Sequence, residues 1–78
     1  MGLRQILGQN VRRYRLAKKL SQEELASLME VEQGFISRLE AGARNPTVDT
    51  LEQISRALGV NAPALLEGKP SSKRNRRD

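Results

Sequence analysis

Apolar residues recur along most of this chain at the spacing of helix faces. Stripes with three- and four-residue intervals occupy five segments, at about 3–19, 22–29, 33–41, 48–58 and 62–67. No segment alternates apolar and polar residues in the manner of a strand, and no internal repeat is present. The pattern therefore predicts an all-α fold of five short helices.

Start and stop signals fit these segments. Ser21 followed by Glu24 matches the S-x-x-E capping box, in which each residue satisfies a free backbone N–H at a helix start. Gly42 is suited to end the third helix, because glycine accepts the left-handed conformation common after a helix. Thr47 is placed to cap the fourth helix and Gly59 to end it. These signals predict separate helices rather than one long one.

The composition divides the chain into a domain and a tail. Seventy-eight residues suffice for one domain, which we expect to cover residues 1–67. Residues 68–78 contain Lys, Pro, Ser, Arg and Asn but no large apolar side chain, and predict a basic tail that is disordered when unbound. The net charge of +5 gathers in the first 22 residues and in this tail. An anionic partner on one side is one interpretation; a solvated helix face with a solubilising tail is the other.

Missing residue types narrow the chemistry. The chain has no cysteine and no histidine, which excludes disulfides, thiolate metal ligation and histidine-assisted nucleophiles. The glycines are scattered and form no phosphate-binding loop. We therefore expect no enzyme and no cofactor, and, since no ligand domain is present, no small-molecule ligand. No apolar run is long enough to span a membrane, so we expect a cytoplasmic protein.

The second and third predicted helices carry the functional signal. They are short and are separated by a turn of three to four residues, which predicts a helix-turn-helix at about residues 21–41. The second member of such a motif can enter a DNA major groove, which is about 12 Å wide. The spacing alone is weak, because short helix pairs occur in many proteins.

A longer stretch strengthens this interpretation. LSQEELASLMEVEQGFISRLEAGARNPTVDTLEQISRALGV contains SQEELA, ISRLE-x-G, R-x-P and L-x-x-I-x-x-A-L-G-V in order. Over about residues 5–66 the chain resembles the Cro/C1-type (XRE-like) helix-turn-helix family of small bacterial and phage regulators. The resemblance implies a five-helix lambda-repressor-like domain that binds roughly palindromic double-stranded DNA as a homodimer and regulates transcription.

The resemblance also assigns base contacts. It makes residues 33–41 the recognition helix, and its outward residues near the start are Gln33, Gly34, Ser37 and Arg38. A glutamine can bind adenine, and an arginine guanine, through two hydrogen bonds. The alternative for Arg38 is a surface ion pair with an acid one turn away.

A second set of residues is expected on the DNA backbone, where contacts fix register without reading sequence. This set is Gln22, Phe35, Arg44, Asn45, Thr47, Arg12 and Arg13. Phe35 could instead be ordinary core, and Arg12 and Arg13 could be a solvated face. The resemblance further implies that Arg15 and Glu40 form a structural salt bridge, so not every cation of the first helix is a DNA ligand.

Two residues depart from the family's pattern. Glu30 stands where the family usually has glycine in the turn, and a positive φ there would cost roughly 1 kcal/mol. Glu32 replaces the usual Ser, Thr or Asp before the recognition helix. These acids are the best case for the rival interpretation, a protein-interaction module that keeps the fold without binding specific DNA. A single-strand or RNA binder is a third, with only Tyr14 and Phe35 available for stacking.

The end of the domain is the candidate dimer surface. Leu58 and Leu65 are expected to close the core, which leaves an interface formed by Val60, Ala62, Pro63 and Leu66. The sequence leaves open whether the chain is a phage repressor, a restriction–modification controller or an antitoxin-like autorepressor. It also leaves open the operator, the regulated gene and the sign of regulation.

Overall fold

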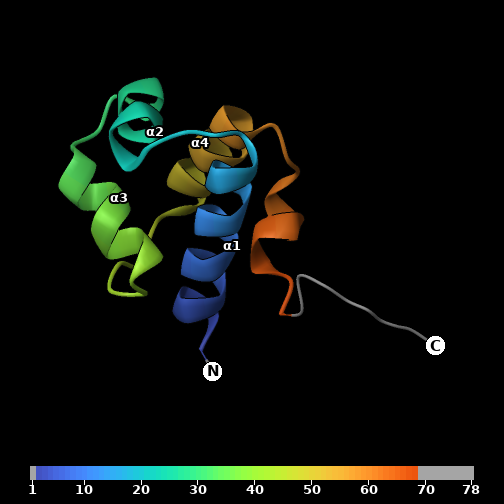
Figure 1. Ribbon diagram of the computed structural model, residues 1–78. Helices are drawn as coiled ribbons and strands as arrows, with labels where there is room; N and C mark the ends of the chain where they lie inside the picture. The colour runs from blue at the N-terminus through green and yellow to red at the C-terminus, as the bar shows by residue number, and fades with distance from the viewer. Residues whose placement is uncertain (1, 69–78) are drawn as a thin grey trace.

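Four α-helices and one 3₁₀ helix make up residues 2–68, the part of the chain that this computed structural model describes (Figure 1). They are α1 (Leu3–Ala17), α2 (Gln22–Met29), α3 (Gln33–Glu40), α4 (Val48–Leu58) and η1 (Ala62–Leu66). Over this range there is no strand and no helix with the length and apolar character needed to cross a membrane. The all-α prediction is therefore confirmed. The predicted disorder of the tail concerns residues that, beyond Gly68, lie outside the described range.

Two predicted helices differ from the observed elements. The first ends at Ala17 rather than at residue 19, because Lys19 adopts a left-handed φ of 60° and the Leu20 N–H turns back to the Arg15 carbonyl. The fifth is a 3₁₀ helix rather than an α-helix. It has only five residues, and Pro63 in its first turn has no N–H to donate.

The capping signals formed as the sequence predicts. The Ser21 hydroxyl accepts from the Glu24 N–H at 2.9 Å, and the Glu24 carboxylate accepts from the Ser21 N–H at 2.7 Å. At the start of α4 the Thr47 hydroxyl accepts from the Thr50 N–H at 3.1 Å. Gly59 ends α4 in the left-handed conformation. The helix boundaries that position the site are thus set locally.

In Figure 1, α1 lies between α3 and η1, and it contacts both. The helices enclose one apolar core, and Leu58 and Leu65 are buried within it as expected. Its buried members are Leu7, Val11, Leu25, Ala26, Met29, Ile36, Leu39, Ile54, Leu58 and Leu65. α1 and α3 touch at Gly8, where a Cβ atom would lie 2.5 Å from the Leu39 carbonyl oxygen. Only glycine permits this approach, which brings α3 against α1.

A buried amide ties the two ends of the domain together. Asn10 on α1 is fully buried, and its Nδ2 donates to the carbonyls of Leu65 at 2.7 Å and Glu67 at 3.0 Å. Its Oδ1 has no hydrogen-bond partner among the described residues. Nothing in the apolar pattern singled out Asn10, because asparagine inside a helix is usually a surface residue.

Candidate nucleic-acid interface

The turn between α2 and α3 keeps a glycine-like shape without glycine. Glu30 has φ 59° and ψ 43°, and the Val31 N–H returns to the Ala26 carbonyl at 2.9 Å, the pattern of a Schellman motif. Glu30 therefore adopts the positive φ that costs a non-glycine residue roughly 1 kcal/mol. Glu32 follows as the N-cap of α3 and makes no side-chain capping hydrogen bond. α3 thus leaves the turn with its first backbone N–H groups uncapped by a side chain.

Beneath this motif lies a buried ion pair. Arg15 Nε lies 2.6 Å from Glu40 Oε2, and Arg15 Nη2 lies 3.0 Å from Glu40 Oε1, so α1 and the end of α3 are joined by two parallel bonds. Their side chains are 7% and 4% exposed. The third guanidinium nitrogen donates to the Leu20 carbonyl at 2.8 Å. Hydrogen bonding to Glu40 raises the pKa of Arg15; burial lowers it by less, and the charge of the carboxylate raises it further. The structure thus places these two residues as the resemblance implies, as a pair within the fold.

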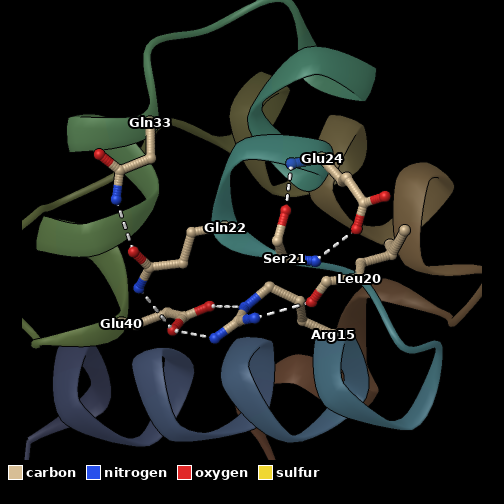
Figure 2. A network of polar contacts seen from close by, with 7 residues as sticks. All are labelled: Arg15, Leu20, Ser21, Gln22, Glu24, Gln33 and Glu40. Atoms are coloured by element: carbon tan, nitrogen blue, oxygen red, sulfur yellow. Dashed lines mark hydrogen bonds and ion pairs between the residues drawn. The ribbon is translucent and has the colours of Figure 1, made fainter.

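Two glutamines extend this network from the ion pair toward the surface by hydrogen bonds. Gln22 Nε2 donates to Glu40 Oε1 at 3.1 Å, and Gln33 Nε2 donates to Gln22 Oε1 at 2.6 Å. Figure 2 shows the resulting chain of contacts from Arg15 to Gln33. It connects the first residue of α2 with the first residue of α3. A base-contact candidate and a backbone-contact candidate are therefore linked before any DNA is present.

The outer face of α3 presents the remaining base-contact candidates together. Gln33, Ser37 and Arg38 are exposed, while Ile36 and Leu39 on the opposite side are buried. Gly34 lies under the guanidinium of Arg38, because a Cβ atom there would lie 3.2 Å from Arg38 Nη1. Among residues 2–68 the ion pairs are Arg15–Glu40 and Arg56–Glu52. Arg38 takes part in neither, so its acid-paired alternative finds no support.

Phe35 is placed between the apolar core and the loop that follows α3. It is partly buried against the apolar core, and the Arg44 guanidinium carbon lies 4.8 Å from the centroid of its ring. A guanidinium stacked on an aromatic face is held in one place with its N–H donors free at the edge. Asn45 beside it is exposed, as is Thr47, whose hydroxyl caps α4. Phe35 thus positions the loop arginine next to α3.

Arg12 and Arg13, the two backbone-contact candidates on α1, are not equivalent. Arg12 and Arg15 are three residues apart and so share a face of α1, the face on which Gly8 touches α3. Arg13 points elsewhere and stacks on Tyr14, with its guanidinium carbon 4.5 Å from the ring centroid. Both are exposed, and neither forms a hydrogen bond or ion pair with the other candidate residues in the described range. The geometry favours Arg12 over Arg13 as a neighbour of the α3 surface.

The residues of the candidate dimer surface differ in how far they are exposed. Val60 packs against the core, while Leu66 is 37% exposed and Pro63 is exposed. Leu66 lines an apolar hollow together with Leu3, which is 63% exposed. Leu3 begins the apolar stripe of the segment at about 3–19, and this spacing predicts that it faces inward. Its exposure could not be read from spacing, because it depends on where η1 and the loop before α4 end.

This motif and its surroundings match known proteins. A family profile described as helix-turn-helix matches residues 11–65. The control protein C.BamHI from Bacillus amyloliquefaciens is 44% identical over 66 residues, which are 83% of this chain and 82% of that protein. A hypothetical transcription factor, NHTF, from Neisseria superposes with a TM-score of 0.81 at 36% identity, covering 85% of this chain and 76% of that one. The restriction–modification controller protein C.Esp1396I, as a tetramer in complex with its natural 35 base-pair operator, superposes with a TM-score of 0.74 at 29% identity. That match covers 83% of this chain and 86% of the controller.

Proposed function

The chain belongs to the Cro/C1-type helix-turn-helix family, and from that premise we propose that it regulates transcription by binding specific double-stranded DNA, as a binding protein rather than an enzyme. The observation that carries the proposal is the outer face of α3. It exposes Gln33, Ser37 and Arg38, and Arg38 forms no ion pair among residues 2–68, so these polar groups are available to base edges. It would then act in the cytoplasm, because the DNA of bacteria, in which its relatives are found, lies there.

On DNA, α3 enters the major groove with its N-terminal end toward the bases. Gln33 has an amide that suits adenine, and Arg38 has a guanidinium that suits guanine. Gln22 on α2 and the stacked Arg44 flank α3 and bind phosphates, with Asn45, Thr47 and Arg12 as further backbone contacts. Arg13, turned toward Tyr14, makes at most a long-range contribution.

Two copies bind together. One helix reads too few base pairs to select a site among the millions of competitors in a genome, and a two-fold axis doubles the sequence read. The surface that joins them is the exposed end of η1, at Pro63 and Leu66 with Ala62 and Val60 beside them, extended by Leu3. The operator is correspondingly a rough palindrome.

The biological role we favour is that of a restriction–modification controller. C.BamHI is matched over 82% of its length at 44% identity, and C.Esp1396I shares the fold along 86% of its chain. The phage relative, the immunity repressor of phage phi105, is 30% identical and is matched over only 42% of its length. The match therefore covers a larger share of each controller's chain than of the phage repressor's chain.

Fluorescence anisotropy with labelled DNA tests the proposal. The protein is titrated into duplex DNA and into the same strand alone, at several salt concentrations. We expect preference for the duplex, with the logarithm of affinity falling linearly with the logarithm of salt. Arg56→Ala is the control for charge, because Arg56 is exposed on α4 and pairs only weakly with Glu52 at 3.9 Å. Equal binding to single strands, or no binding to either, would contradict the proposal.

A further inference from the structure

Glu40 fixes the orientation of the Gln22 side-chain amide. Its two carboxylate oxygens take three hydrogen bonds, two from Arg15 and one from Gln22 Nε2 at 3.1 Å. A carboxylate paired with a guanidinium only accepts hydrogen bonds. Gln22 must therefore point its NH₂ group, and not its oxygen, at Glu40. The glutamate side chain is 4% exposed and held from two sides, so it cannot turn away to accommodate the other arrangement.

The orientation of the Gln22 amide in turn fixes the orientation of the Gln33 amide at the start of α3. With its NH₂ group on Glu40, Gln22 presents its Oε1 to Gln33, whose Nε2 donates to it at 2.6 Å. The Gln33 oxygen consequently points away from α2, as Figure 2 shows. Gln33 is exposed, and without this chain of contacts its amide could adopt two orientations that differ little in shape.

The orientation that results is the one that matches adenine. One Nε2 hydrogen of Gln33 is engaged with Gln22, and its second Nε2 hydrogen and its Oε1 remain available to a base. Adenine offers an N7 acceptor beside an N6 donor, and an amide in a fixed orientation satisfies both at once. Guanine offers two acceptors, of which this amide can satisfy only one.

We propose that Glu40 is a positioning residue for base preference: through Gln22 it fixes the direction of the Gln33 amide and thereby favours adenine opposite Gln33. The proposal rests on the proposed function, since it concerns the base read by α3. It separates two roles of one side chain. Toward Arg15 the carboxylate stabilises the fold, and toward Gln22 it sets specificity.

The test measures a ratio of affinities that does not depend on how much protein is folded. The first duplex carries the preferred base pair at the position whose preference disappears in Gln33→Ala, and the second carries a different pair there. Glu40→Gln keeps the size of the side chain but allows either amide direction, so the ratio should fall about fivefold. Gln22→Met leaves the ion pair intact and should lower the ratio equally, and the double variant should show no further loss.

Arg15→Lys is the matched control for the structural role. It weakens the ion pair from its other side and leaves the contact between Glu40 and Gln22. We expect it to lower thermal stability while leaving the affinity ratio unchanged. If Arg15→Lys reduces the ratio as much as Glu40→Gln does, or if Glu40→Gln leaves the ratio intact, Glu40 is structural only and the proposal is overturned.

A measurement on the free protein separates this inference from DNA binding. In ¹H–¹⁵N NMR spectra the side-chain NH₂ signals of Gln22 and Gln33 report on their hydrogen bonds. Glu40→Gln should shift both pairs of signals, although of the two glutamines residue 40 contacts only Gln22. Such shifts in a protein that binds no DNA would sustain the chain of contacts and defeat the proposed function. An unmoved Gln33 signal in a protein that binds specific DNA would defeat the inference alone.

Discussion

The side-chain amide of Asn10 on α1 donates to the Leu65 carbonyl on η1 at 2.7 Å, across 55 positions of sequence. The same nitrogen donates to the Glu67 carbonyl at 3.0 Å. Because Asn10 is fully buried, its bond to the Leu65 carbonyl forms without water competing for it, and its bond to Glu67 is partly buried. They hold the end of the domain, and with it the candidate dimer surface, against the first helix.

Replacing the Asn10 amide should lower the free energy of unfolding, because two backbone carbonyls lose their donor at once. In Asn10→Ala the buried carbonyl of Leu65 and the partly buried carbonyl of Glu67 lose their donor, and an unsatisfied buried group costs about 1–3 kcal/mol. We expect the free energy of unfolding to fall by about 2–3 kcal/mol in a urea titration. Gln9→Ala, on the exposed side of α1, is the control and should stay within about 0.5 kcal/mol. Equal effects of the two changes would show that the amide contributes nothing particular.

The turn at Glu30 offers a stabilising substitution. A non-glycine residue at φ 59° is strained, so Glu30→Gly should raise the free energy of unfolding by roughly 0.5–1 kcal/mol. Glu32→Gly is the control, because Glu32 has an ordinary φ of −77° and gains no relief. Thermal melting of both variants provides the measurement. A Glu30→Gly protein that melts below the unchanged protein would show that the glutamate side chain contributes more than the backbone strain removes.

Arg38 and Arg44 should affect DNA binding differently. Arg38 lies on the outer face of α3, so Arg38→Ala should weaken the preferred site by about 1–3 kcal/mol and relax specificity at one base pair. Arg44 is stacked on Phe35 in the following loop, so Arg44→Ala should weaken all sequences alike and reduce the salt slope by about one. Both are compared with Arg56→Ala in salt-dependent titrations. Two variants with the same sequence-independent loss would remove the distinction between base and backbone contacts.

The dimer surface is tested by charge. Leu66→Glu places a carboxylate in the apolar hollow that Leu66 shares with Leu3, and should shift the protein from dimer to monomer. Leu28→Glu is the matched control, since Leu28 is 60% exposed on α2 and lies outside that hollow. Mass measured by light scattering across a range of protein concentrations distinguishes the two. If the unchanged protein is monomeric at high concentration and on its operator, the proposed interface is wrong.

Local features could be predicted from the sequence, and distant contacts could not. The capping box of Ser21 and Glu24, the cap at Thr47 and the end of α4 at Gly59 each involve residues within one turn, and all formed as predicted. The turn at Glu30 was harder, because glutamate has no local preference for the positive φ that the turn adopts. The fifth element differed because Pro63 and the short length favour a 3₁₀ helix.

The candidate site shows the same division. The outward residues of α3 follow from helical periodicity once the motif is placed. The contact of Gln22 with Glu40 does not, because it joins residues 18 positions apart that meet only when α2 packs over the end of α3. Asn10 was missed for the same reason, since its partners lie at the other end of the domain. Leu3 was misjudged because its surroundings are formed by η1 and the loop before α4.

We expect two copies of this chain to bind together, and each to read specific DNA through its α3. Selection of bound duplexes from a random DNA pool, followed by sequencing, tests this expectation most directly. The account predicts an inverted repeat whose half-sites lie about one helical turn apart, roughly 10–10.5 base pairs. It also predicts that the same selection with Gln33→Ala loses preference at one symmetric position in each half-site. A pool that shows no enriched sequence after repeated rounds, or a motif unchanged by Gln33→Ala and Arg38→Ala together, would contradict it.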